Sequence, residues 1–301
     1  MGRGTWSWIV PDGLWEVAEP LIPPSKVWPQ GGGTQDTPDE TLFAAIIYVL
    51  VSGSAWRAFA TVFRRIEVDR ASPVPDLVPA GVWGRLHEEI LHRLDDADLL
   101  DLSRAVLDSA HGRAKKGSEL AGPSPVDRGK PCSKMHVLSD ANGLPLLVGV
   151  SAADTHDNLA LKPVITGHQT SHDPYRGRYF KPQRLHADKA YDIPHLRKWL
   201  RGGRIGVRIA RKGIESSERL GRRGWVIERT MSWLTGYRRL NHRYERHPRN
   251  YLAFLGLAAA LCCYKRLVRL TTYGLASMSF FELATDRVMG REAQRARPPG
   301  C

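Results

Sequence analysis

The spacing of apolar residues changes near residue 100, and this change constrains the fold more than any other feature of the chain. Before residue 100, apolar positions recur at intervals of three and four, which is typical of amphipathic helices. After it, short apolar runs alternate with helical segments. A chain of 301 residues is long enough for two folding units. We therefore expect an all-α region over 1–100 and an α/β region after it.

Three helices are expected in the N-terminal region. The first covers residues 15–22 and ends at two consecutive prolines, Pro23 and Pro24. The second begins at Pro38 and ends at Gly53, and the third covers 81–94. The segment 64–80, which contains three prolines, shows no clean period.

The order of elements after residue 100 predicts a mixed sheet. Strands are expected at 103–108, 133–139, 144–150, 184–187 and 206–210, and helices at 156–166, 193–200, 225–234 and 251–267. The segment 112–130 is polar and Gly-rich, so we expect a loop there. Asn142–Gly143 is a hairpin signal between the second and third strands. Three strands followed by helix–strand crossovers predict a mixed sheet with helices on both faces.

Several classes of protein are disfavoured by composition. At 42% hydrophobic and 25% charged residues, the chain can bury a real core and is not expected to be disordered. The longest apolar stretch, 252–264, is too short to span a bilayer, and residues 1–10 do not read as a signal peptide. The four cysteines show neither zinc spacing nor a disulfide framework, so we expect a cytoplasmic protein.

The charge of the chain points to a polyanionic partner. The net charge is +13, and residues 201–250 alone hold fourteen Lys and Arg against four Asp and Glu. Such a concentration of positive charge favours nucleic acid as the partner. A solvated basic surface without a partner is the alternative.

Three carboxylates are expected at positions where α/β sheets usually bind their ligands. Asp108 is expected at the end of the first strand, Asp188 follows the strand at 184–187, and Glu228 lies one turn into a helix. Strand ends of open sheets bind ligands. Three carboxylates in one crevice require a cation, and hard oxygen ligands suit Mg²⁺ or Mn²⁺. Two such ions about 4 Å apart clamp the attacking and leaving oxygens of a phosphodiester.

Each carboxylate also has an ordinary structural interpretation. Asp108 could cap the turn after its strand, Asp188 could pair with Lys189 or Arg184, and Glu228 could pair with a neighbouring arginine on its helix. The pair His156–Asp157 has the look of a metal site, but it more simply begins a helix.

From about residue 15 to 267, the chain resembles bacterial insertion-sequence transposases of the DDE type, specifically the insertion-sequence-five group. The segments that carry the resemblance include LFAAIIYVLVSGSAWR, RAVLDSAHGRAKKG, GPSPVDRGKPCSKMHVLSDANGLPLLVGVSAADTHDN, LHADKAYD and RRGWVIERTMSWLTGYRRLNHRYER. The family's catalytic triad maps onto Asp108, Asp188 and Glu228, the same residues that the pattern of strands and helices indicates.

The resemblance implies a fold, a reaction and partners. The expected fold is a ribonuclease-H-like catalytic core at 101–267, preceded by a helix-turn-helix-like DNA-binding region at 1–100. The expected reaction is cleavage and strand transfer at the terminal inverted repeats of an insertion sequence. Asp108 would bridge two Mg²⁺ or Mn²⁺ ions, with Asp188 and Glu228 completing the ligand set. The partners would be the element ends, target DNA and a second copy of the chain, at the nucleoid.

Basic residues near the triad are expected to contact DNA phosphates, which position DNA without reading its sequence. These predicted contacts are Lys115, Lys116, Lys130, Lys134, Arg222, Arg223, Arg229, Arg238 and Arg239. For each of them, solvated surface is the alternative.

Two departures from the family bear on activity. Related transposases carry a basic residue four positions before the glutamate, where this chain has Gly224. The segment 64–80 also lacks the basic recognition helix that the family would place there, and we hypothesise a local frame slip in the gene. The tail at 268–301 extends beyond the family-like region. The alternatives to an active transposase are a decayed copy that retains only DNA binding, and a host nuclease with the same core.

Overall fold

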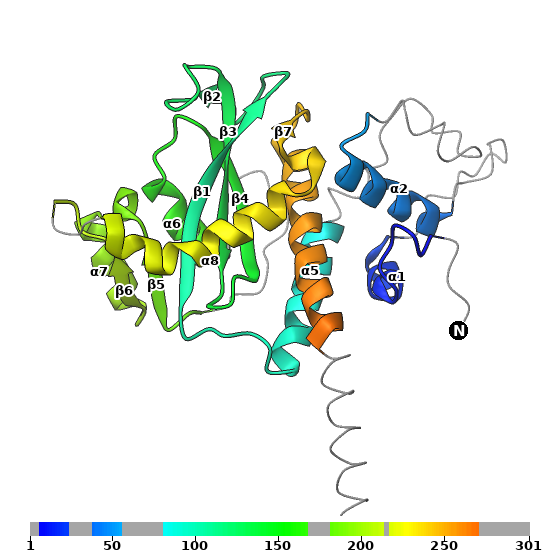
Figure 1. Ribbon diagram of the computed structural model, residues 1–301, viewed down its shortest axis with the longest axis horizontal. Coiled ribbons are helices and arrows are strands. Elements are labelled where there is room, and N and C mark those ends of the chain that lie inside the picture. Colours follow the sequence, from blue (N-terminus) through cyan, green and yellow to red (C-terminus); the bar gives the residue numbers. More distant parts are fainter. Residues whose placement is uncertain (1–5, 24–37, 56–80, 168–180, 214–216, 271–301) are drawn as a thin grey trace, which may run out of the picture.

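The computed structural model describes residues 6–23, 38–55, 81–167, 181–213 and 217–270, except the side chains of 217–224. Within these residues, helices surround one seven-stranded sheet (Figure 1). The atypical segment 64–80 and the tail from 271 onward lie outside the described residues.

The N-terminal region is helical, as the apolar spacing predicts. Its described elements are α1 (Leu14–Ala18), the short 3-10 helix η1 (Glu19–Leu21), α2 (Asp39–Ser52) and α5 (Val82–Asp96). Helix α2 ends at Gly53, which adopts φ 71°. A Cβ at this position would lie 2.9 Å from the Cβ of Arg238, so both the conformation and the close approach require glycine here.

The sheet is mixed. Its strands are β1 (Ala105–Ala114), β2 (Gly122–Pro123), β3 (Pro131–Ser139), β4 (Pro145–Ala152), β5 (Arg184–Ala187), β6 (Gly206–Ile209) and β7 (His242–Arg243). The five main strands lie in the order β4-β3-β1-β5-β6. Strand β3 is antiparallel to β1 and β4, whereas β5 is parallel to β1 and β6 is parallel to β5. The expected mixed sheet is therefore present.

The first strand is longer than expected. We predicted a strand ending at Asp108 and a loop over 112–130, but β1 continues to Ala114 and pairs with β3 as far as Arg113. Strand β7 pairs beside this extension, and the fully buried side chain of Arg243 donates hydrogen bonds to the carbonyl of Leu120 and the hydroxyl of Ser133. These long-range partners stabilise the polar end of β1 as a strand, which the local pattern of apolar residues does not predict.

The turn between β3 and β4 is built around a buried carboxylate. Asp140 is fully buried and accepts hydrogen bonds from the backbone N–H groups of Asn142 (2.9 Å) and Leu144 (2.7 Å). Gly143 adopts φ 85°, which agrees with the expected Asn-Gly hairpin.

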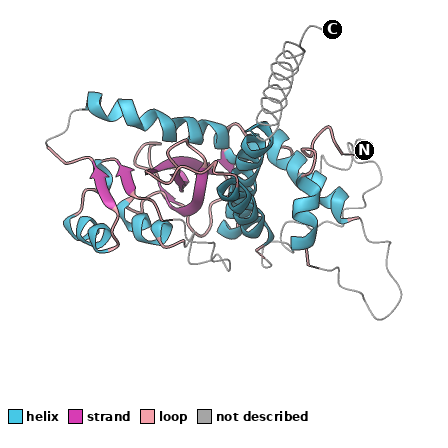
Figure 2. Cartoon of the chain, turned by 90° about the horizontal axis from the view of Figure 1, so that it is seen from below, coloured by secondary structure: helices cyan, strands magenta, loops and turns pink. Residues whose placement is uncertain are grey.

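Helices cover both faces of the sheet. Helices α6 (Asn158–Ile165) and α7 (Pro194–Gly202) lie on one face, and α8 (Ser217–Thr235) lies on the other (Figure 2). Helix α8 packs on β1 and β3, α6 packs on β3 and β4, and α7 packs on β6. Helix α8 begins earlier than the expected 225–234, so Glu228 lies near its middle and not one turn from its start.

The last described helix, Pro248–Leu270, completes the core of the N-terminal helices. Its Tyr264 hydroxyl donates to the carbonyl of Asp12 (2.7 Å), and its Cys263 lies against His87 of α5. One apolar cluster runs from α1 through α2 and α5 to this helix and into the sheet. By length and composition the helix could cross a membrane, but most of it is buried inside the protein, as in the core helix of a soluble fold.

Candidate active site

Asp108 lies inside strand β1 and not at its end. It pairs in register with Val137 of β3, and its carboxylate accepts the backbone N–H of Ser109 at 2.7 Å. The residue is partly buried. Because residues of a strand alternate between faces, Asp108 and Ser109 lie on opposite sides of the sheet.

Asp188 follows β5 directly, as the sequence predicts. Ala187 pairs with Leu107, so the parallel register places Asp188 beside Asp108. The carboxylate of Asp188 also accepts the backbone N–H of Ala190 at 2.8 Å and caps the 3-10 helix Lys189–Tyr191. The side chain is otherwise exposed, which leaves it able to bind a further partner.

Glu228 reaches the same region from helix α8. Its neighbours Val226 and Ile227 are buried, and the hydroxyl of Thr230 donates to the carbonyl of Gly143 at 2.7 Å. These contacts hold α8 across β1 and β3. Glu228 itself is exposed.

The charges of these carboxylates act on Asp108. Burial raises the pKa of Asp108 to about 6, and the negative charges of Asp188, Asp157 and Glu228 raise it further against the Ser109 hydrogen bond. A carboxyl group beside like charges is stabilised by a nearby cation. Among the described residues, no three His, Cys, Asp or Glu side chains lie close enough to enclose one ion. Carboxylate oxygens are nevertheless hard donors of the kind that divalent metals such as Mg²⁺ prefer.

A fourth carboxylate, Asp157, lies beneath the site and was not predicted to belong to it. It accepts hydrogen bonds from the hydroxyl of Ser109 (2.8 Å) and forms an ion pair with Lys134 (3.0 Å). Burial opposes ionisation of Asp157, but these two hydrogen bonds prevail and lower its pKa. The expectation that His156–Asp157 begins a helix is confirmed, since Asp157 is the N-cap of α6.

Two predicted DNA contacts are corrected by this arrangement. Lys134 is only 5% exposed and also donates to the carbonyl of Thr155 at 2.7 Å. Arg239 is 8% exposed and pairs with Glu245 through two nitrogens, at 2.6 and 2.8 Å. Both side chains are committed to carboxylates inside the fold, so neither is available to a phosphate.

The other predicted contacts differ in accessibility. Lys115, Lys116 and Arg238 are exposed, and Lys130 pairs with Asp127 at 3.4 Å. The side chains of Arg222 and Arg223 lie outside the described residues.

Arg229 is held in place on the outer face of α8. Its guanidinium carbon lies 4.6 Å from the ring centre of Trp225 and 4.8 Å from that of Trp233, and it donates to the carbonyl of Asn142. Trp225 and Trp233 are 50% and 38% exposed. The arginine thus braces α8 against the β3–β4 turn.

Two family models match separate parts of the chain. Residues 100–263 match the family described as the transposase DDE domain, and residues 10–68 match a family described as putative transposases of the IS4/5 family. The chain is similar to a putative transposase for insertion sequence element IS402 from Burkholderia cepacia, with 37% identity over 68% of this chain and 97% of the relative. It is also similar to an uncharacterized 16.2 kDa protein of insertion element IS402 from the same organism, with 34% identity over 39% of this chain and 81% of that protein.

Proposed function

The chain belongs to the DDE transposases of the IS4/5 type, and on that premise we propose that Asp108, Asp188 and Glu228 are its catalytic carboxylates. The chain is a transposase, an enzyme that acts on DNA. The observation that carries the proposal is geometric: the parallel register of β1 and β5 places Asp188 beside Asp108, and Glu228 lies on α8, which packs on β1.

We infer that the reaction is cleavage and strand transfer at the terminal inverted repeats of an insertion sequence. Divalent ions, Mg²⁺ or Mn²⁺, would supply activation of the attacking hydroxyl and charge neutralisation at the leaving oxygen. Asp108, Asp188 and Glu228 are the residues that would hold them. The Ser109 N–H orients the carboxylate of Asp108, and the Asp188 side chain is oriented by the N–H of Ala190. Above pH 6 the carboxylate of Asp108 is ionised, which is the form that binds a metal.

The strand order supports a ribonuclease-H-like core. Three antiparallel neighbours, β4, β3 and β1, are followed by two parallel strands, β5 and β6, with the carboxylates on β1, after β5 and on the covering helix. The helix-turn-helix-like role of 1–100, the homodimer on paired ends and the nucleoid location belong to the same proposal. Family membership does not favour the two alternatives, a decayed copy or a host nuclease.

The test is cleavage of a labelled duplex that carries the element's own end, in Mg²⁺ or Mn²⁺. We expect end-specific nicking by the wild type and none by Asp108→Ala or Glu228→Ala. Glu89→Ala is the matched control, since Glu89 is an accessible carboxylate on α5 that pairs with Arg93, away from the triad. Nicking that survives in both triad variants, or that is lost equally in the control, would refute the assignment.

A further inference from the structure

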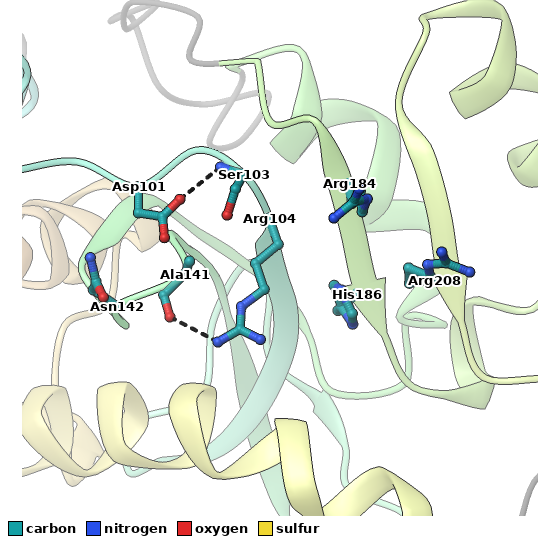
Figure 3. Close-up of a pocket in the computed structure, with 8 residues that line it drawn as sticks. All are labelled: Asp101, Ser103, Arg104, Ala141, Asn142, Arg184, His186 and Arg208. Carbon is teal, nitrogen blue, oxygen red and sulfur yellow. Dashed lines mark hydrogen bonds between the residues drawn. The ribbon is translucent and has the colours of Figure 1, made fainter.

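A basic cavity lies at the start of the parallel strands, apart from the carboxylates. Its volume is about 350 Å³, and Figure 3 shows its lining. Arg184 and His186 come from β5, and Arg208 comes from the neighbouring β6. Arg104, immediately before β1, faces them across the cavity. Three guanidinium groups therefore share one hollow, an arrangement that is unfavourable without an anion.

The strand register places this cavity on the same face as the carboxylates. His186 pairs with Val106 on one side and with Arg208 on the other, and Val106 is two residues before Asp108. Paired residues of neighbouring strands lie on one face, and so do residues two apart in a strand. Arg208, His186 and Asp108 thus lie on the face that α8 crosses.

Arg104 is held by a local contact, and one acidic residue of the lining, Asp101, interacts with its charge. Arg104 donates one hydrogen bond to the carbonyl of Ala141 at 3.3 Å, which leaves most of its five N–H donors available. The one acidic lining residue, Asp101, accepts the backbone N–H of Ser103 at 2.9 Å. Within the described part of the chain, none of the ion pairs includes Arg104, Arg184 or Arg208.

The glycine opposite Arg184 makes room for its side chain. Gly206 pairs with Arg184 in the sheet, and a Cβ at Gly206 would lie 3.0 Å from the Cγ of Arg184. The long arginine stem therefore lies over a position where most side chains would crowd it. On β6, Gly206 leaves space for the Arg184 side chain, and Arg208 adds a positive charge to the cavity lining.

The cavity lies at a distance from the active site that DNA can span. Arg184 begins β5 and Asp188 directly follows it, so the two are four residues apart, which corresponds to about 13 Å of extended chain. One strand of B-form DNA advances about 3.4 Å per nucleotide along its axis, so the same distance covers about four nucleotides.

We propose that Arg104, Arg184, His186 and Arg208 form a phosphate subsite that binds the backbone of the cleaved DNA strand about four nucleotides from the scissile phosphate. The assignment rests on the proposed function for its reference point, the scissile phosphate. Guanidinium groups in a fixed hollow match the charge and the hydrogen-bonding geometry of a phosphodiester. The subsite would fix the register of the strand and would not read its bases.

The first experiment measures how binding to the element-end duplex depends on salt, in EDTA so that cleavage does not interfere. Each phosphate contact that is lost lowers the slope of log K against log salt by about 0.9. We expect Arg184→Ala/Arg208→Ala to lower the slope by about one and to weaken binding about tenfold at low salt. The control is Arg201→Ala/Lys198→Ala, which removes two exposed cations from α7, on the opposite face of the sheet. Arg184→Lys/Arg208→Lys keeps the charge and should restore most of the slope, and thermal unfolding checks that every variant is folded.

The second experiment locates the contact. Single neutral methylphosphonates are placed along the strand, and cleavage is measured in Mg²⁺. We expect a three- to tenfold loss at one or two positions, three to five nucleotides from the cut, and no such loss in Arg184→Ala/Arg208→Ala, which has already lost the contact.

Three outcomes would overturn the subsite. The slope of the arginine variant could equal that of the α7 control, the methylphosphonate profile could be unchanged by the variant, or the cavity could bind a free nucleoside monophosphate while DNA binding stays unaffected. If the wild type fails to cut the element end but the arginine variant still loses slope, the triad proposal fails and phosphate binding by the cavity stands.

Discussion

Strand β1 has a carboxylate near each of its two faces, and the two differ in what balances their charge. On the α6 side, Asp157 receives a hydroxyl from Ser109 and the ammonium group of Lys134, and its pKa is lowered. On the α8 side, Asp108 receives one backbone N–H and faces other carboxylates, and its pKa is raised to about 6.

The different charge partners suit the two carboxylates to different roles, one structural and one functional. A carboxylate paired with a buried lysine is costly to leave without that partner and has little capacity left for a ligand. A carboxylate that burial and like charges disfavour costs stability, and such groups mark functional sites. The missing partner of Asp108 is, in our proposal, supplied by divalent metal.

The strongest test of this difference replaces each carboxylate by its neutral amide and measures the rate of DNA cleavage. A metal ligand contributes several kcal/mol to the transition state, so Asp108→Asn should lower the cleavage rate on the order of 10³-fold. Asp157→Asn keeps the shape of the side chain and should lower the rate less than about tenfold by the same reasoning. Equal losses of cleavage rate in the two variants would show that Asp108 and Asp157 do not differ in function.

The second test removes the cation that balances Asp157. Lys134→Met leaves a partly buried carboxylate unpaired and should lower the free energy of unfolding by about 2–4 kcal/mol at pH 7. The double variant Lys134→Met/Asp157→Leu should recover more than half of this loss, because no uncompensated charge remains. Denaturant unfolding measures both, and a double variant no more stable than Lys134→Met would contradict the pairing.

The third test uses pH. The pKa of Asp108 rises from 3.8 in the unfolded chain to about 6 in the folded protein, so the folded state binds more protons between these values. Ionisation of Asp108 therefore costs about 2–3 kcal/mol at pH 7, and this cost disappears as the pH falls through 6 toward 4. In metal-free buffer, Asp108→Asn should be more stable than the wild type at pH 7 and should lose that advantage near pH 4.

The effect of Asp157 on stability should depend on pH in the opposite direction. Its pKa is lowered on folding, so its contribution is present above the unfolded value of 3.8 and is lost as the pH falls through the folded value. Asp157→Asn should therefore be less stable than the wild type at pH 7, with the difference shrinking in acid. If the stability of both asparagine variants relative to the wild type changed in the same direction with pH, the opposite pKa shifts of Asp108 and Asp157 would be refuted.

The smallest expected effect concerns the neighbour of Asp108. Asp188 is the first of the three carboxylates that raise the pKa of Asp108, so Asp188→Asn should lower that pKa. Carboxyl NMR titration without metal measures the change. Glu89→Gln, remote on α5, should leave the titration of Asp108 unmoved, and a pKa of Asp108 that is insensitive to Asp188 would show that the two carboxylates do not meet.

Local patterns were sufficient for much of the fold. Helix α2, strand β5 and the Asn-Gly turn lie where apolar spacing and turn residues predict them. The placement of Asp188 after β5 and of Glu228 on a helix follows from the same patterns. Each of these features depends on residues close together in the chain.

Features that depend on distant partners were missed. The length of β1 is supported by β3 and by β7 with Arg243, and the last two are more than a hundred residues away in the chain. Lys134 and Asp157 are 23 residues apart and meet only once the sheet has formed, so a lysine that looked free to bind DNA is an internal counter-ion. Arg239 was misassigned for a related reason, since its partner Glu245 lies across a turn.

The C-terminal helix has a consequence for synthesis of the protein. The helices near the N-terminus, α1, α2 and α5, share their core with Pro248–Leu270, which is translated after the last strand of the sheet. Until this helix has been translated, the N-terminal elements lack its contacts, such as those of Cys263 with His87 and of Tyr264 with Asp12. The N-terminal region therefore acquires its final packing only after the whole α/β region has been translated, and fragments that stop before residue 248 should aggregate or be degraded.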